Sequence, residues 1–314
     1  MDIKERLRMF LGAEPAKIIA RLSPGDFEQL TELRLRAGKP MLIKLAGQEY
    51  VLTPKGRAQA SSPDAYHPSA ADIAETLERI SQYSFYAFEP ELCHGYITLP
   101  GGHRVGVCGQ AVIENGVVRA WRHISSINFR VAHAVMGCAD GVLPFLYEAG
   151  RIMHTMIISP PGCGKTTLLR DIVRQASNGA EGRTGLTIGL VDERSEVAGC
   201  FKGIPQNDIG PRTDVLDGCP KAEGMVMLLR AMSPDVIAVD ELGGKDDAEA
   251  AQAVLTAGVK LLCTVHGSGL EDIRKNPALE GLISRKIFQR YIVLSAPGQA
   301  AVLDGGGDAI CYQA

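Results

Sequence analysis

The pattern of apolar and polar residues changes period several times in the first half of the chain. Over residues 3–33 apolar residues recur at helical spacing, with a break at Ser23-Pro24-Gly25. From Glu32 onward they alternate with polar residues, and residues 41–51 read as a hairpin around a central glycine. These patterns predict short helices followed by strands.

Helical spacing returns over residues 70–88, after a linker-like stretch at 53–70 that contains three prolines. The 70–88 segment ends in a cluster of aromatic residues, which we expect to pack in a core because aromatic side chains dominate core burial. Alternating segments then resume between residues 95 and 131, with Asn115-Gly116 as a strong two-residue hairpin signal. The pattern therefore predicts a smaller α+β N-terminal domain over residues 1–136.

Residues 137–150 contain several glycines and a proline, and we interpret them as a connector. Beyond them, continuous apolar runs alternate with helical patterns, as expected for strands buried on both faces of a largely parallel sheet. The expected strands are Leu186–Val191, Val236–Val239, Val259–Val265 and Ile287–Leu294, with a short one near Ala300–Leu303 and a loose glycine-rich tail. Residues 151–314 are therefore predicted to form an α/β domain.

Composition narrows the functional classes. The formal charge is −3, and residues 1–150 carry 16 Lys and Arg against 16 Asp and Glu, so no basic half is hidden and no nucleic-acid partner is expected. Eight cysteines without a Cys-x-x-Cys pair favour reduced thiols over disulfides or zinc.

No apolar run reaches the ~18 residues needed to cross a bilayer, and the N-terminus lacks the apolar core of a signal peptide. We expect a cytoplasmic protein that acts on a membrane only from outside the lipid.

The motif with the clearest chemistry is Ser159-Pro160-Pro161-Gly162-Cys163-Gly164-Lys165-Thr166-Thr167, which lies between an apolar strand and an amphipathic helix. Glycines allow backbone N–H groups to surround a phosphate, and the helix N-terminus adds positive potential. Lys165 is placed to reach the β- and γ-phosphates of ATP, and the Thr166 hydroxyl to bind Mg²⁺. Ser159 stands where the usual pattern begins with glycine, and the alternative interpretation is an ordinary glycine-rich turn.

A second motif follows the predicted strand Val236–Val239, where Asp240 and Glu241 come in succession. Ligands of α/β sheets bind at the carboxyl ends of the strands. Asp240 is therefore expected to hold Mg²⁺, and Glu241 to orient and polarise the attacking water. Such an acidic pair is common by itself, and the phosphate loop upstream is what favours this interpretation.

Two further strand ends carry polar residues. The stretch Asp192-Glu193-Arg194-Ser195-Glu196 has three carboxylates in five residues, and Glu193 is a candidate for positioning water or magnesium. Acidic residues at a helix N-terminus explain the same stretch equally well. His266 follows another strand, where it either senses the γ-phosphate through a hydrogen bond or is a polar residue beside a turn.

The order of these motifs resembles that of the type II/IV secretion ATPase superfamily. The stretch Met227–Ile237 is similar to the Leu-Leu-Arg and Arg-Pro-Asp-x-Ile segments of that superfamily. More closely, Gly102–Gly106, Ser126–Ala132, Gly164–Asp171 and Val191–Glu196 resemble the stage III sporulation protein AA family of endospore-forming bacteria. Secretion ATPases usually carry Gly-Glu where this chain has Asp240-Glu241.

This resemblance implies a RecA-like P-loop ATPase domain behind a smaller N-terminal domain, with ATP and Mg²⁺ as cofactors. It also implies a homo-oligomeric ring, expected to be a hexamer, docked on integral membrane proteins of a secretion-like channel between mother cell and forespore, on the mother-cell side. Arginines of the N-terminal domain can approach the nucleotide in the superfamily, and Arg104, Arg122 and Arg130 are candidates here.

Two other functions are compatible with the same motifs. One is a nucleic-acid-stimulated motor on the same core, against which the absence of a basic half counts. The other is a scaffold in which nucleotide orders a ring without being hydrolysed.

Overall fold

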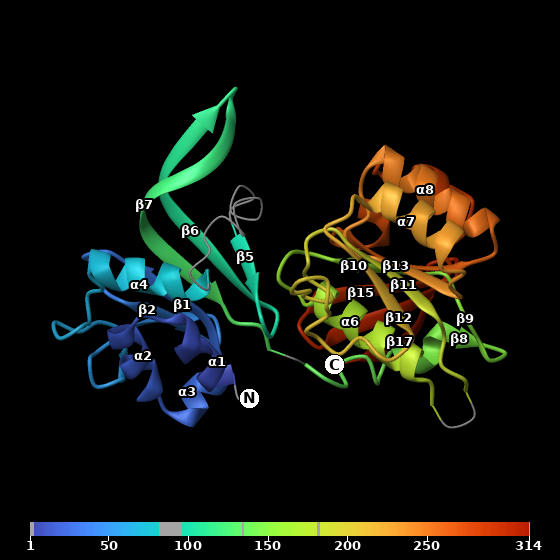
Figure 1. The fold of residues 1–314 in the computed structure, drawn as a ribbon. Helices are drawn as coiled ribbons and strands as arrows, with labels where there is room; N and C mark the ends of the chain where they lie inside the picture. The colour runs from blue at the N-terminus through green and yellow to red at the C-terminus, as the bar shows by residue number, and fades with distance from the viewer. Residues whose placement is uncertain (1–2, 82–95, 134, 181–182, 314) are drawn as a thin grey trace. The chain divides into compact units, whose positions relative to one another are not determined.

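The computed structural model describes residues 3–81, 96–133, 135–180 and 183–313. The chain divides into two compact units, Met1–His133 and Ala134–Ala314 (Figure 1). The aromatic residues expected to pack at the end of the 70–88 segment, from Tyr83 to Phe88, lie outside the described residues.

The first unit is an antiparallel sheet with a helical layer. Its helices and strands are α1 (Ile3–Phe10), α2 (Ala13–Ala20), α3 (Pro24–Glu28), β1 (Leu30–Arg36), β2 (Leu42–Leu45), β3 (Gln48–Leu52), β4 (Ala58–Gln59), α4 (Ala70–Ile80), β5 (Tyr96–Leu99), β6 (His103–Glu114) and β7 (Val117–Arg130). Among the described residues the strand order is β4-β3-β2-β1-β7-β6-β5. Apolar side chains of α1, α2 and α4 pack with Leu33, Val105 and Phe129 of the sheet in one core.

The strands β6 and β7 continue beyond the sheet as a twisted ribbon (Figure 1). β7 pairs with β1 only over Ser126–Arg130, and β6 pairs with β5 only over His103–Gly106, whereas β6 and β7 pair with each other out to Glu114 and Val117. The turn between them is the expected Asn115-Gly116, in which both residues have positive φ. The alternating pattern expected on the C-terminal side of this turn is thus one continuous strand, β7, whose pairing with β6 contains two bulges.

The second unit is a sheet covered by helices. Its elements are η2 (Leu143–Leu146), β8 (Tyr147–Glu148), β9 (Arg151–Ile152), β10 (Thr155–Ser159), α6 (Lys165–Asn178), β11 (Ile188–Asp192), β12 (Thr213–Asp217), α7 (Lys221–Ala231), β13 (Val236–Val239), α8 (Lys245–Thr256), β14 (Lys260–His266), α9 (Leu270–Ile273), α10 (Glu280–Ser284), β15 (Arg290–Ala296), β16 (Gln299–Asp304) and β17 (Ala309–Gln313).

This sheet is mixed: most of its strands run parallel, as expected, and two antiparallel strands extend it at one edge. Its order in the described residues is β12-β11-β13-β14-β10-β15-β16-β17. The strands from β12 to β15 run parallel, whereas β16 and β17 add antiparallel strands at one edge. A short turn at Pro297-Gly298 and a glycine-rich turn at 305–307 make these antiparallel connections possible, because antiparallel neighbours need no crossover helix.

Successive residues of the central strands face two different cores. Ile157 and Ala238 pack with α6 on one face, whereas Ile158 and Val239 pack with α7 and α8 on the other. Burial on both faces explains why these strands appear as continuous apolar runs in the sequence.

The segment 137–150, expected to be a connector, contributes side chains to the core of the second unit that contains α6. Ala139, Val142 and Leu146 are fully buried there. The backbone N–H of Ala139 donates to the Asp171 carboxylate on α6 at 2.8 Å, and Asp171 also accepts from Arg174. The helix and the segment are therefore joined by buried hydrogen bonds as well as by apolar contact. In the 53–70 segment, Tyr66 likewise packs against the first core.

Candidate functional site

The predicted site residues follow parallel strands at the same edge of the second sheet. Ser159 of β10 is in register with His266 of β14, and Val191 of β11 with Val239 of β13. Since parallel strands end at one edge, the loops after them meet there. The phosphate loop and the two acidic stretches are thereby brought together.

The loop between β10 and α6 has the backbone conformation of a phosphate cradle. Gly162 and Gly164 have φ of +81° and +89°, which L side chains rarely adopt. Gly164 is the residue before α6, so the N–H groups of the first helical turn open toward the loop. Ser159, where the usual pattern has glycine, is instead the fully buried last residue of β10 in an extended conformation.

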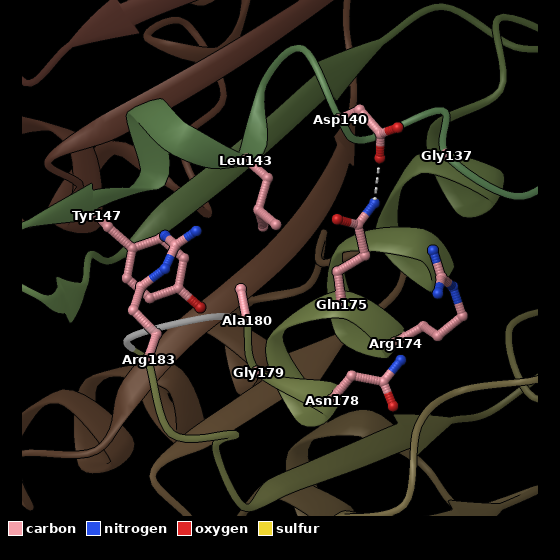
Figure 2. A pocket seen from close by; sticks show the side chains of 10 residues that line it. All are labelled: Gly137, Asp140, Leu143, Tyr147, Arg174, Gln175, Asn178, Gly179, Ala180 and Arg183. Carbon is pink, nitrogen blue, oxygen red and sulfur yellow. Dashed lines mark hydrogen bonds between the residues drawn. The ribbon is translucent and has the colours of Figure 1, made fainter.

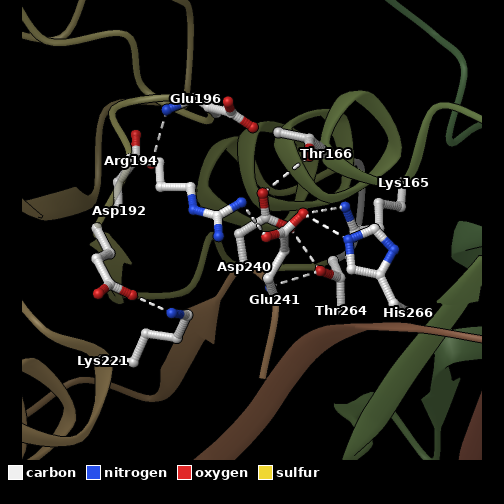
Figure 3. A network of polar contacts seen from close by, with 11 residues as sticks. Lys165, Thr166, Asp192, Arg194, Glu196, Lys221, Asp240, Glu241, Thr264 and His266 are labelled. Atoms are coloured by element: carbon white, nitrogen blue, oxygen red, sulfur yellow. Dashed lines mark hydrogen bonds and ion pairs between the residues drawn. The ribbon is translucent and has the colours of Figure 1, made fainter. Parts of the chain in front are cut away.

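Lys165 and Glu241 form the centre of the site (Figure 3). The Lys165 Nζ lies 2.6 Å from Glu241 Oε1, and the two side chains are only 10% and 15% exposed. His266 Nε2 lies 2.9 Å from the same oxygen. Arg194, from the loop after β11, places Nη1 2.5 Å from the other oxygen, Glu241 Oε2.

These partners determine the ionisation of Glu241. Partial burial by itself raises its pKa, but the hydrogen bond from Lys165 and the charges of Lys165 and Arg194 outweigh burial. The pKa of Glu241 is therefore held below its ordinary value, and the carboxylate is ionised at neutral pH.

Asp240 is held by two hydroxyl groups. The Thr166 hydroxyl donates to Asp240 Oδ2 at 2.8 Å, and the Thr264 hydroxyl donates to Asp240 Oδ1. Thr264 also accepts the backbone N–H of Glu241 at 2.8 Å, where φ of Glu241 is +58°. β14 thus fixes both the carboxylate of Asp240 and the unusual backbone turn that directs Glu241 toward Lys165.

The carboxylates of the acidic stretch that begins at the end of β11 have different surroundings and different partners. Asp192 is 1% exposed and accepts the backbone N–H groups of Glu196, Val197 and Ala198 at 2.8–3.0 Å. Burial nonetheless raises its pKa. Glu193 forms an ion pair with Lys221 at the start of α7 rather than with Lys165. Asp192 therefore shapes the loop, and Glu193 lies at its rim, lining the same small pocket as Glu241.

An apolar pocket adjoins the phosphate loop. Its lining residues come from the loop, from α6 and from the turn between β15 and β16, and include Cys163, Thr167, Leu294 and Pro297. Thr167 lines this pocket. A mostly apolar pocket with a few polar groups is the usual setting for a small-molecule ligand.

The donor set around Thr166 and Asp240 is composed of oxygen atoms, which Mg²⁺ prefers. Across the described residues there is no group of three His, Cys, Asp or Glu side chains that could hold a metal ion. A magnesium ion held by Thr166 and Asp240 would take further oxygen ligands from phosphate and water, as is usual for this ion.

A second hollow lies at the opposite end of α6 (Figure 2). Gln175 donates to Asp140 at 2.7 Å, and the Arg183 guanidinium stacks on the Tyr147 ring at 4.5 Å. A helix of 14 residues is about 21 Å long, so this hollow is separate from the phosphate loop. It contains none of the predicted site residues.

The candidate arginines belong to the first unit. Arg104 of β6 and Arg130 of β7 are direct cross-strand partners, and Arg104 also stacks on the Tyr96 ring at 4.0 Å. Arg122 pairs with Gln110 on the distal ribbon. Two of the three candidates therefore lie side by side and the third lies apart from them.

The sequence interpretation missed the positions of Arg194 and Thr264. Arg194 lies within the acidic stretch, where the carboxylates draw attention, and Thr264 lies two residues before His266. A polar residue inside an otherwise apolar strand, as at Thr264, is the signal that could have indicated a buried hydrogen-bond role.

No helix of the described residues is both long enough and apolar enough to cross a bilayer.

A family model and a curated relative both relate this chain to the same sporulation family. A protein-family model described as "Sporulation stage III, protein AA" matches residues 1–309. Stage III sporulation protein AA of Bacillus subtilis (strain 168) is 43% identical over 267 residues, covering 85% of this chain and 83% of that protein. An uncharacterized ycf45 protein of Porphyra purpurea is 33% identical over 51% of this chain and 27% of that protein.

Two solved structures share the fold at low identity. The pilus retraction motor PilT with bound ADP has a TM-score of 0.56 and 17% identity, covering 88% of this chain and 79% of that one. The ATPase DotB of Yersinia pseudotuberculosis has a TM-score of 0.55 and 14% identity, covering 90% of this chain and 74% of that one. The fold is thus shared with the ATPase DotB and with the motor PilT.

Proposed function

This chain belongs to the sporulation stage III protein AA family, and from that membership and the site geometry we propose that it is a Mg²⁺-dependent ATPase. One observation carries the proposal: Lys165 of a phosphate loop contacts Glu241, and Thr166 contacts Asp240, at the carboxyl edge of a parallel set of strands. Handling a magnesium-bound triphosphate requires a cation, a metal-binding hydroxyl and an acid pair in this arrangement.

The loop from Ser159 to Thr167 binds the phosphates of ATP through backbone N–H groups. Lys165 exchanges Glu241 for oxygens of the β- and γ-phosphates, which frees Glu241 to polarise a water molecule. The water oxygen then bonds to the γ-phosphorus as the bond from that phosphorus to the bridging oxygen of ADP breaks, and Glu241 accepts the proton that the water loses. His266 stays near the γ-phosphate, and Glu193 positions solvent at the rim.

Thr166 and Asp240 would hold Mg²⁺, which supplies neutralisation of phosphate charge when bound. The apolar pocket that includes Cys163 and Pro297 receives the base. PilT, whose fold is similar, was solved with ADP. We propose the same nucleotide class here, on a RecA-like domain.

The wider role is also a proposal. The protein forms a homo-oligomeric ring, a hexamer in the simplest case, docked on integral membrane proteins of a sporulation channel on the mother-cell side, and hydrolysis powers or gates that channel. Arg104, Arg122 and Arg130 are the candidates for an arginine that a neighbouring chain supplies to the nucleotide, and Arg104 and Arg130 are direct cross-strand partners.

The test is the ATPase rate per chain as a function of protein concentration, with sedimentation of the same samples. Wild type is expected to hydrolyse ATP with a rate per chain that rises as rings form, since an arginine from a neighbour can raise the rate about 1,000-fold. Lys165→Ala should abolish binding and hydrolysis. If dilute monomer hydrolyses ATP as fast as assembled protein, the intersubunit site is excluded.

Glu241→Gln distinguishes an enzyme from a scaffold. The amide keeps the size of the side chain but cannot accept a proton from water. Channel function in sporulating cells should be lost together with hydrolysis. Function that survives without hydrolysis would show that nucleotide only orders the ring.

A further inference from the structure

Arg194 contacts Glu241 from outside the phosphate loop and is not among the residues assigned to binding or hydrolysis of ATP. It lies in the loop after β11, and its side chain is 62% exposed. Its Nη1 lies 2.5 Å from Glu241 Oε2, while Lys165 Nζ lies 2.6 Å from Oε1 (Figure 3). A nearly buried ammonium and an exposed guanidinium therefore bind the two oxygens of one carboxylate.

The loop that carries Arg194 is fixed by its neighbours. Asp192 accepts the backbone N–H groups of Glu196, Val197 and Ala198. The Ser195 hydroxyl donates to Asp217, and φ of Ser195 is +52°. The backbone of Arg194 is thus anchored on both sides, although its side chain reaches through solvent.

A terminal phosphate offers the same oxygen acceptors as the Glu241 carboxylate. Because the two cations share one carboxylate, a phosphate bound by Lys165 lies within reach of Arg194. A guanidinium binds phosphate through two parallel N–H groups and keeps its charge at any physiological pH. A diphosphate lacks the terminal group that this contact requires.

We infer that Arg194 is a γ-phosphate-binding residue supplied by the same chain, which exchanges Glu241 for the terminal phosphate of a nucleoside triphosphate. This inference rests on the proposed ATPase function. The exchange serves two purposes: it stabilises charge on the transferred phosphoryl group and it removes a cation from the carboxylate that polarises water.

The experiment compares Arg194→Ala with wild type for binding of ADP and of a non-hydrolysable ATP analogue, and for ATP turnover. Affinity for the analogue is expected to fall about tenfold, whereas ADP affinity changes less than about twofold, because only the triphosphate contacts the guanidinium. Turnover should fall about 100-fold. Arg194→Lys should recover part of both losses, and Arg285→Ala, which removes another exposed arginine, should change neither.

The same comparison in a Glu241→Gln protein distinguishes phosphate binding by Arg194 from an effect that Arg194 exerts through Glu241. In Glu241→Gln the ion pair is removed, so an arginine that acts only by restraining Glu241 has no further effect. Arg194→Ala is expected to lower ATP affinity about tenfold in this background as well.

Three results would overturn the inference. They are equal losses for ADP and the analogue, faster turnover in Arg194→Ala, and no effect of Arg194→Ala in the Glu241→Gln background. Wild-type protein that binds neither nucleotide overturns the proposed function itself. If wild type binds the analogue, any of the three results overturns the role of Arg194 alone.

Discussion

At the scale of single residues, Glu241 is the point where the charges of the site meet. Three donors from three separate segments, Lys165, Arg194 and His266, converge on its carboxylate. Its left-handed backbone conformation is uncommon for a residue other than glycine, and such conformations cluster at functional sites. The local fold therefore accepts strain in order to direct this carboxylate.

The lowered pKa of Glu241 predicts how its contribution to stability depends on pH. An acid whose pKa is lower in the folded than in the unfolded chain stabilises the fold above its unfolded pKa, about 4.3. That contribution is lost as the pH falls through the lower folded value. The difference in unfolding free energy between wild type and Glu241→Gln should be constant near neutral pH and shrink below pH ~4, as measured by denaturant titration. A difference that does not change with pH would show that the ion pairs do not stabilise the fold.

The sequence predicted some of these residues for reasons that the geometry explains. Lys165 and Glu241 follow apolar strands, so their place at the sheet edge followed from the pattern. Ser159 breaks the glycine pattern without consequence for the backbone, because the left-handed conformations fall at Gly162 and Gly164. The partner of Glu193 could not be predicted, since Lys221 lies 28 residues away on another element.

At the scale of elements, α7 approaches β11 closely because both carry glycine at the contact. A methyl group on Gly224 would lie 2.6 Å from Val191 Cγ1, and one on Gly189 would lie 2.9 Å from Leu228 Cδ1. β11 leads directly into the loop of Arg194. The distance between helix and strand therefore affects where that loop begins.

Gly224→Ala should destabilise the protein, although alanine is the better helix former, because the added methyl group pushes α7 away from β11. A loss of about 1–3 kcal/mol is expected for overpacking. Gly281→Ala is the matched control, since Gly281 also lies in a helix but has open space around it; it should stabilise by about 0.5–1 kcal/mol. Thermal and denaturant unfolding of both variants measure the two effects, and equal changes would contradict the packing argument.

The strands that the sequence did not predict lie at sheet edges. β12 reads Thr-Asp-Val-Leu-Asp and is only half buried, so it lacks the apolar run that identified its neighbour β11. β17 follows a glycine-rich turn that suggested a loose tail. Edge strands are covered on fewer sides, so their sequences carry a weaker hydrophobic signal.

At the scale of the whole molecule, each unit has its own hydrophobic core. The core of the first unit contains residues between Leu7 and Val131, and the two cores of the second contain residues between Ala139 and Val302. No residue is shared among them in the described parts of the chain. Each unit is therefore expected to fold independently of the other.

Fragments 1–133 and 134–314 should each fold when expressed alone. Fragment 134–314 contains the phosphate loop, Asp240 and Glu241, so it is expected to bind the ATP analogue. It should hydrolyse ATP at least about 100-fold more slowly than the full chain, because the proposed arginines of the first unit are missing. Circular dichroism, calorimetry and ATPase assays measure these properties, and full activity of the fragment would exclude a role for Arg104 and Arg130.

Within the part of the chain that the structure describes, the ribbon formed by β6 and β7 has no neighbouring strand at either edge beyond the sheet. Unpaired edges are templates on which further strands can add, and they are a common origin of aggregation. Two bulges, at Cys108/Gln110 and Val112/Ile113, interrupt the regular ladder of this ribbon. Bulges increase twist and misalign the backbone groups of an edge, so the irregularities that bend the ribbon also protect the protein from polymerising through it.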